Sequence, residues 1–263
     1  MANAISEMPG CRWHDKNFVS RVYAIRDKGI EIFGPTNLIL SGDIGYKEVK
    51  AARNFFLVTE PDTSVYPTLA NWTKRGGLVE HTDFAAAIAF NLADAVNRSV
   101  GARLNPHAHE AALKLHDLGR ATTHAFMETD VMTDHLWQMI GLRPDLHRLT
   151  HSAHLYWDEV EVPPDKLTIP QKISVVADTA GKRSAIDADR LRLVGEIIPA
   201  VKEGKKKYID KLNPSFYERQ MVEKLPEYSR REEQVIGYTL WWFNHVGINL
   251  DAIIQAIPIE RLS

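Results

Sequence analysis

The amino-acid sequence predicts an all-helical protein. Apolar residues recur at three- and four-residue steps through much of the chain, which is the spacing of one buried helix face. The two-residue alternation that is typical of strands is scarce. Residues that favour helix starts precede several of these segments, for example Asn105 before Pro106. With 263 residues, 44% of them hydrophobic, the chain can bury a substantial core.

The individual helices follow from this periodicity. A clear apolar face begins near Leu78, after two glycines, and continues for about five turns. Asn105 is expected to cap the next helix, with Gly119 at its end, and proline residues can open two later helices. The sequence therefore predicts helices over these segments: 14–28, 46–58, from 78, 106 to about 119, from 144, from 170, 214–225, 230–245 and 250–256.

We divide the predicted helices into three parts. Residues 1–45 form an N-terminal arm, residues 46–190 a helical core, and residues 191–263 a C-terminal helical extension that packs on the core.

Composition narrows the classes of function. The net charge of -2 and the pI near 6.6 give no general attraction to nucleic acid or membranes, so an anionic substrate must be held by local cations or by a metal. Cys11 is the single cysteine, which rules out a disulfide within the chain and favours a cytoplasmic location. No apolar run approaches the roughly 20 residues of a membrane helix. Nucleic acid is not excluded as a partner, and a homo-oligomer is compatible with the sequence.

Four residues that can bind a metal lie beside the apolar faces of three predicted helices: His81, His116, Asp117 and Asp178. A carboxylate beside apolar surface is costly to bury unless a cation compensates it. Imidazole nitrogens and carboxylate oxygens together suit Mn, Fe, Co, Ni or Zn. The sequence therefore predicts a metal site here, against the alternative that these are ordinary hydrogen-bonded core residues.

Three segments resemble the H…HD…D signature of the HD-domain superfamily, in order and in spacing. They read Gly-Gly-Leu-Val-Glu-His-Thr at 76–82, Leu-His-Asp-Leu-Gly-Arg at 115–120 and Val-Val-Ala-Asp at 175–178. The resemblance covers about residues 70–185. It implies an HD-type helical core with additional N- and C-terminal helices, and a metal centre formed by the four residues named above.

The resemblance also implies an activity, which is metal-dependent hydrolysis of a phosphate ester or anhydride in a nucleotide or small phosphorylated metabolite. A metal-activated water would attack phosphorus, and Asp117 would bind the metal and orient that water. Arg120, where related proteins carry a lysine, would grip the phosphate, and Lys182 would add to the cationic group. The chain lacks the Gly-Tyr-Pro motif of cyclic-dinucleotide phosphodiesterases and the nucleotidase-type carboxylate at position 120, so the substrate stays open.

Further histidines leave a second question open, the number of metal ions. His135 and His154 resemble the two additional ligands of two-metal members, with His147 and His151 as competitors; alternatively, these histidines face solvent. A two-metal centre would admit a di-iron oxygenase that acts on a small organic substrate. The remaining alternatives are an HD module that acts on nucleic acid phosphodiesters and a sensor that binds a nucleotide without hydrolysing it.

Overall fold

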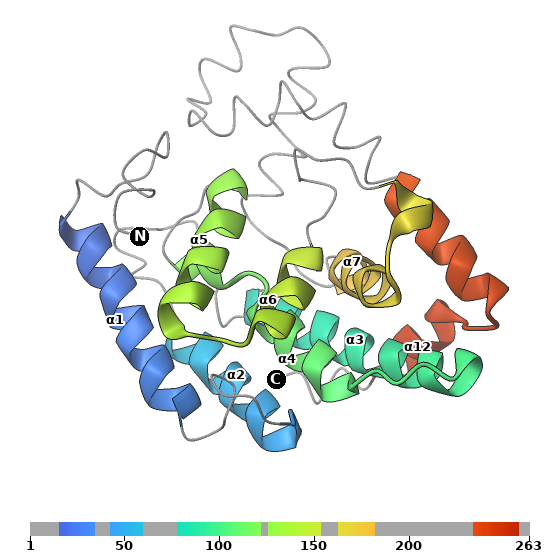
Figure 1. Cartoon of the computed structure of the whole chain (residues 1–263), viewed down its shortest axis with the longest axis horizontal. Coiled ribbons are helices and arrows are strands. Elements are labelled where there is room, and N and C mark those ends of the chain that lie inside the picture. Colours follow the sequence, from blue (N-terminus) through green and yellow to red (C-terminus); the bar gives the residue numbers. More distant parts are fainter. Residues whose placement is uncertain are drawn as a thin grey trace, which may run out of the picture.

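The structure is a computed structural model, and it describes residues 16–34, 43–59, 78–121, 126–153, 163–181 and 234–257. Every regular element within these ranges is a helix, which confirms the predicted all-α class (Figure 1). None of the helices in the described ranges is both long enough and apolar enough to cross a membrane. The predicted helix over 214–225 lies outside these ranges.

The elements follow one another in an order that largely matches the periodicity. They are α1 Lys16–Phe33, α2 Tyr46–Val58, α3 Leu78–Val100, α4 Pro106–Leu115, a 3-10 helix Leu118–Ala121, α5 Phe126–Ile140, α6 Pro144–His151, a 3-10 helix Pro164–Lys166, α7 Ile169–Gly181, a helix over 234–245, and α12 Leu250–Ala256. The bounds predicted for α2 and α12 are confirmed. The first helix extends beyond its predicted end, and α5 was not predicted at all.

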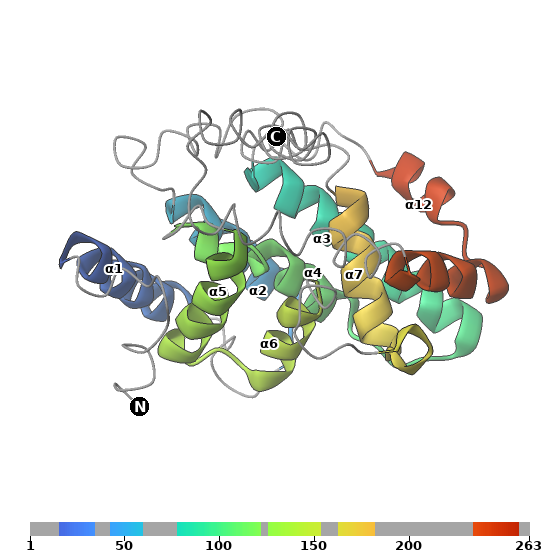
Figure 2. The ribbon, with the colours of Figure 1, turned by 90° about the horizontal axis from the view of Figure 1, so that it is seen from above.

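Helix α3 is the centre of the fold. It packs against α4 and α7 along much of its length and also contacts α2 and α12. Figure 2 shows α3 and α7 side by side, with α1 at one end of the molecule and α12 at the other. The buried face of α3 combines alanines, such as Ala85, Ala89 and Ala93, with larger side chains, such as Ile88 and Leu92, and none of these five has measurable exposure. Where an alanine faces a neighbouring helix, the two backbones can approach closely.

Local signals explain where two of these helices begin and end. The side chain of Asn105 accepts hydrogen bonds from the backbone N–H groups of His107 and Ala108, which caps the first turn of α4. Gly141 ends α5, and its φ of 78° lies in the left-handed region that favours glycine. Both the Gly141 N–H and the Leu142 N–H donate to the carbonyl of Trp137.

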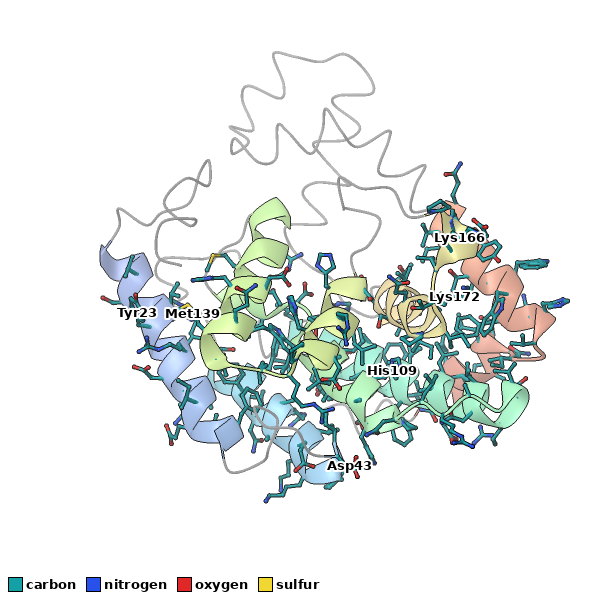
Figure 3. All side chains as sticks on the ribbon, viewed as in Figure 1. Tyr23, Asp43, His109, Met139, Lys166 and Lys172 are labelled. Atoms are coloured by element: carbon teal, nitrogen blue, oxygen red, sulfur yellow. The ribbon has the colours of Figure 1, made fainter. Side chains whose placement is uncertain are left out.

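The helix over 234–245 packs against α7 through a buried lysine. Lys172 of α7 donates a hydrogen bond to the carbonyl of Leu167. Its ammonium lies 5.7 Å from the ring centre of Tyr238 and 5.5 Å from that of Trp242. Figure 3 shows Lys172 on the side of α7 that faces this C-terminal helix. Cation–π contacts of this kind fix the late helix on the element that carries Asp178.

Candidate metal centre

Three of the predicted ligands meet in the interior, between α3, the end of α4 and α7. The Nε2 atom of His81 lies 3.2 Å from Nε2 of His116 and 3.3 Å from Oδ1 of Asp178. The distance from His116 Nε2 to the same Asp178 oxygen is 3.2 Å. All three side chains are buried, and Asp178 has no measurable exposure. Asp178 thus faces the two imidazoles, as the metal-site prediction requires.

Asp117 adds a second carboxylate to this group. Its Oδ2 atom lies 3.5 Å from His81 Nε2 and 3.4 Å from His116 Nε2. Metal–ligand bonds of about 2.1 Å place neighbouring ligand atoms about 3.0–3.4 Å apart around a common ion. Four of the five spacings given above lie within that range, and the 3.5 Å between Asp117 Oδ2 and His81 Nε2 lies just beyond it. Within the described residues, the group that could hold a metal ion consists of His81, His116 and Asp178, whose ligand atoms all lie within 4.8 Å of one another, and the predicted ligand Asp117 is not part of it.

The backbone orients His116 toward the centre. Helix α4 ends at Leu115, so His116 occupies the C-cap position and Asp117 follows in a turn, rather than both lying in the last helical turn as predicted. The Nδ1 atom of His116 lies 2.7 Å from the carbonyl oxygen of Leu113 and donates to it. Nε2 therefore carries the lone pair that faces the centre, which is the arrangement found in metal-ligating histidines.

His81 also packs against Gly181, the last residue of α7. A Cβ atom on Gly181 would lie 3.2 Å from Nδ1 of His81 and 2.9 Å from the Cβ of Ala85. Only glycine allows α3 and α7 to approach this closely without displacing the imidazole. Within the described residues, Nδ1 of His81 has no hydrogen-bond partner, so this atom does not hold the ring in place.

The two carboxylates change the proton affinity of His81. Burial lowers the pKa of this imidazole, but its hydrogen bonds and charge interactions with Asp117 and Asp178 outweigh burial and raise the pKa to about 9. In the metal-free protein at neutral pH, the ring is therefore an imidazolium. One positive charge is held at the same point where a metal ion would bind.

Arg120 lies beside the centre, on the 3-10 helix after Asp117. Its side chain is buried, and its Nε atom lies 3.6 Å from Oδ1 of Asp117. Asp117 thus directs one oxygen toward the imidazoles and the other toward the guanidinium. The backbone N–H of Arg120 also donates to the carbonyl of Asp117 at 3.0 Å, which closes the turn.

Two residues that the sequence did not single out hold this turn from outside. The hydroxyl of Thr133, on α5, accepts a hydrogen bond from the N–H of Gly119 at 2.7 Å. On the other side, Nε of Arg21 in α1 donates to the carbonyl of Ala121 at 2.7 Å. Thr133 is polar, whereas the other buried residues in the described part of α5 are apolar. That difference is the one sequence signal that could have identified it.

The additional histidines are placed differently from the four predicted ligands. His135 is half-buried, and burial lowers its pKa. The metal-ligand group found within the described part of the chain includes neither His135 nor Asp117, but Asp117 contacts both imidazoles of that group. His147 and His151 of α6 instead approach Asp134, at 2.7 Å and 3.7 Å. His154 and Lys182 lie outside the described residues.

The chain was also compared with known proteins. No protein-family model, no curated protein and no solved structure gives a significant match.

Proposed function

We propose that this chain is a metal-dependent phosphohydrolase of the HD type, which acts on a nucleotide or a small phosphorylated metabolite. The observation that supports the proposal best is the convergence of two imidazoles and two carboxylates from three segments of the chain, with spacings of 3.2–3.5 Å between their ligand atoms. Nitrogen and oxygen ligands of this kind suit Mn, Fe, Co, Ni or Zn.

The chemistry fits an attack on phosphorus. A divalent cation bound at such a centre supplies Lewis acidity toward a phosphoryl oxygen and lowers the pKa of water. His81, His116 and Asp178 would hold the cation, while Asp117 would both contact it and orient the attacking water. Arg120 would bind the non-bridging oxygens of the phosphate, because a planar guanidinium can donate two parallel hydrogen bonds to them. Lys182 would contribute a further cation.

No observation favours the oxidative alternative over hydrolysis. A di-iron centre would need both His135 and His154 as ligands in addition to the four residues above. Among the described residues, the one group suited to a metal lacks His135, and His154 falls outside the part of the chain that the structure describes. We therefore propose a single ion, and hydrolysis rather than oxygenation.

The test is metal analysis of chelator-free protein, combined with a phosphate-release screen over nucleotides, sugar phosphates, model diesters and oligonucleotides. We expect Asp117→Ala to abolish release. The matched control is Asp145→Ala, because Asp145 is also paired with a nearby arginine, at 3.0 Å from Nε of Arg143, but lies on α6. Undiminished phosphate release by the Asp117→Ala protein would refute the proposal, as would wild-type protein that contains no metal and releases no phosphate.

A further inference from the structure

A second group of buried charged side chains lies at the interface of α3 and α4, outside the candidate metal centre. Asp83 of α3 is 2% exposed and Lys114 of α4 is 7% exposed. The ammonium of Lys114 donates a hydrogen bond to Oδ1 of Asp83. The Nε atom of Arg53, from α2, lies 3.0 Å from Oδ2 of the same residue. One buried carboxylate thus binds cations from two different helices.

The Asp83–Lys114 ion pair joins the same two segments that carry the imidazoles of the metal centre. Asp83 comes two residues after His81, and Lys114 comes two residues before His116. A slip of α3 along α4 by one helical turn would move these atoms by about 5.4 Å. That movement would break the ion pair, and it would also separate the two Nε2 atoms that now lie 3.2 Å apart.

The apolar part of this interface combines large and small side chains. Phe90 of α3 lies against His107 of α4, with ring centres 5.0 Å apart, and both helices also bury alanines. Burial of apolar surface is non-directional, so it tolerates a shift of one helix along the other more readily than a buried ion pair does. A buried ion pair is satisfied in one register only, since either charge buried alone is costly.

We infer that Asp83 and Lys114 are positioning residues that set the register of α3 on α4, and thereby hold the Nε2 atoms of His81 and His116 at the spacing of metal ligands. The inference rests on the metal centre of the proposed function and does not depend on the phosphate chemistry.

Arg53 provides a matched control within the same cluster. Lys114→Met removes the link between α3 and α4 but leaves Asp83 its contact with Arg53. Arg53→Met removes the other cation from the same carboxylate and leaves the link between α3 and α4 intact. Lys114→Arg keeps both the charge and the link. The experiment measures the binding of Co²⁺ to the full chain of wild type and of each variant, at fixed pH, by titration and by the absorption spectrum of the bound ion.

We expect Lys114→Met to bind Co²⁺ about 10- to 100-fold more weakly, the range typical for loss of a residue that supports metal ligands. Arg53→Met should change the affinity by less than about fivefold, since its partly exposed ion pair is weak. Lys114→Arg should bind nearly as tightly as wild type. Removal of a positive charge near a cation site by itself strengthens cation binding, so weaker binding by Lys114→Met reports geometry rather than electrostatics.

The inference is overturned if Lys114→Met binds Co²⁺ as tightly as wild type, or if Arg53→Met weakens binding equally. If circular dichroism shows that Lys114→Met does not fold, the double variant Asp83→Leu/Lys114→Met takes its place, because it leaves neither charge of the pair buried. We expect the double variant to show the same loss of Co²⁺ affinity. Unfolding of both would show that the pair serves the fold in general and would also overturn the inference. Wild-type protein that binds no Co²⁺ contradicts the metal centre itself, and that result is distinct from the others.

Discussion

Metal binding is expected to release a proton from His81, and the pKa of this imidazole determines how strongly the metal affinity depends on pH. Burial lowers the pKa of this imidazole, but the hydrogen bonds and charges of Asp117 and Asp178 raise it overall, to about 9. A metal ion needs the unprotonated Nε2 atom as a ligand, so it must displace that proton. Binding therefore competes with protonation throughout the neutral range.

The magnitude follows from the pKa. With a value of about 9, roughly one molecule in a hundred carries neutral His81 at pH 7, so the apparent affinity for a divalent ion should rise about tenfold per pH unit between pH 6.5 and 8. Each ion should release about one proton. Isothermal titration calorimetry in buffers of different ionisation enthalpy measures both quantities. An affinity that is independent of pH, with no proton released, would refute the reasoning.

The same shift has a consequence for the metal-free protein. Because the pKa of His81 is higher in the folded chain than its ordinary value of 6.5, this group stabilises the fold fully below pH 6.5, and the stabilisation is lost as pH rises through about 9. The free energy of unfolding should fall by on the order of 3 kcal/mol across this window. A His81→Gln variant should lack that fall, which urea denaturation at each pH would detect.

Three further predictions concern residues outside the ligand set. Burial lowers the pKa of His109 on α4 (Figure 3) to about 4, so the protein should lose about 2 kcal/mol of stability between pH 6.5 and 5, and His109→Leu should abolish that loss in acid unfolding curves. Gly181→Ala should weaken metal binding about tenfold by displacing the imidazole beside it, whereas Gly237→Ala, with open space around the new Cβ, should not. Thr133→Val should lower the free energy of unfolding by about 1–3 kcal/mol, because the buried N–H of Gly119 loses its acceptor, and Thr133→Ser should restore it. Normal metal binding by Gly181→Ala would contradict the close packing of Gly181 on His81. Normal stability of Thr133→Val would contradict the hydrogen bond between Thr133 and Gly119.

The sequence predicted best the elements that have strong local signals. The bounds of α2 and α12 match, and the start of α4 follows from Asn105 and Pro106, because capping and ring geometry act within a few residues. Helix α5 was missed because its buried face, formed by Met132, Thr133, Leu136, Trp137 and Ile140, includes a threonine. That threonine interrupts the apolar pattern, because its hydroxyl accepts a hydrogen bond from the N–H of Gly119.

The candidate site was only partly accessible to sequence reasoning. Residues that carry metal-binding groups, such as His81 and Asp178, could be named because few other roles suit them beside an apolar face. The buried cluster of Asp83, Lys114 and Arg53 could not be distinguished from an ordinary solvated surface, because each of these residues lies on a different helix. Such contacts depend on the register between helices, which no local pattern specifies.

The net charge of the candidate metal centre differs between the metal-free and the metal-bound protein, and this difference bears on the proposed substrate. In the metal-free protein, Asp117 and Asp178 are balanced by the imidazolium of His81 and the guanidinium of Arg120, so the fold can form without leaving net charge buried. A divalent ion that displaced the proton would neutralise both carboxylates by itself, and Arg120 would then contribute one positive charge in excess. A buried cation of this kind attracts an anion. Metal binding would thus convert a neutral cluster into one that favours a phosphate group, which is the order of events that a metal-dependent phosphohydrolase requires.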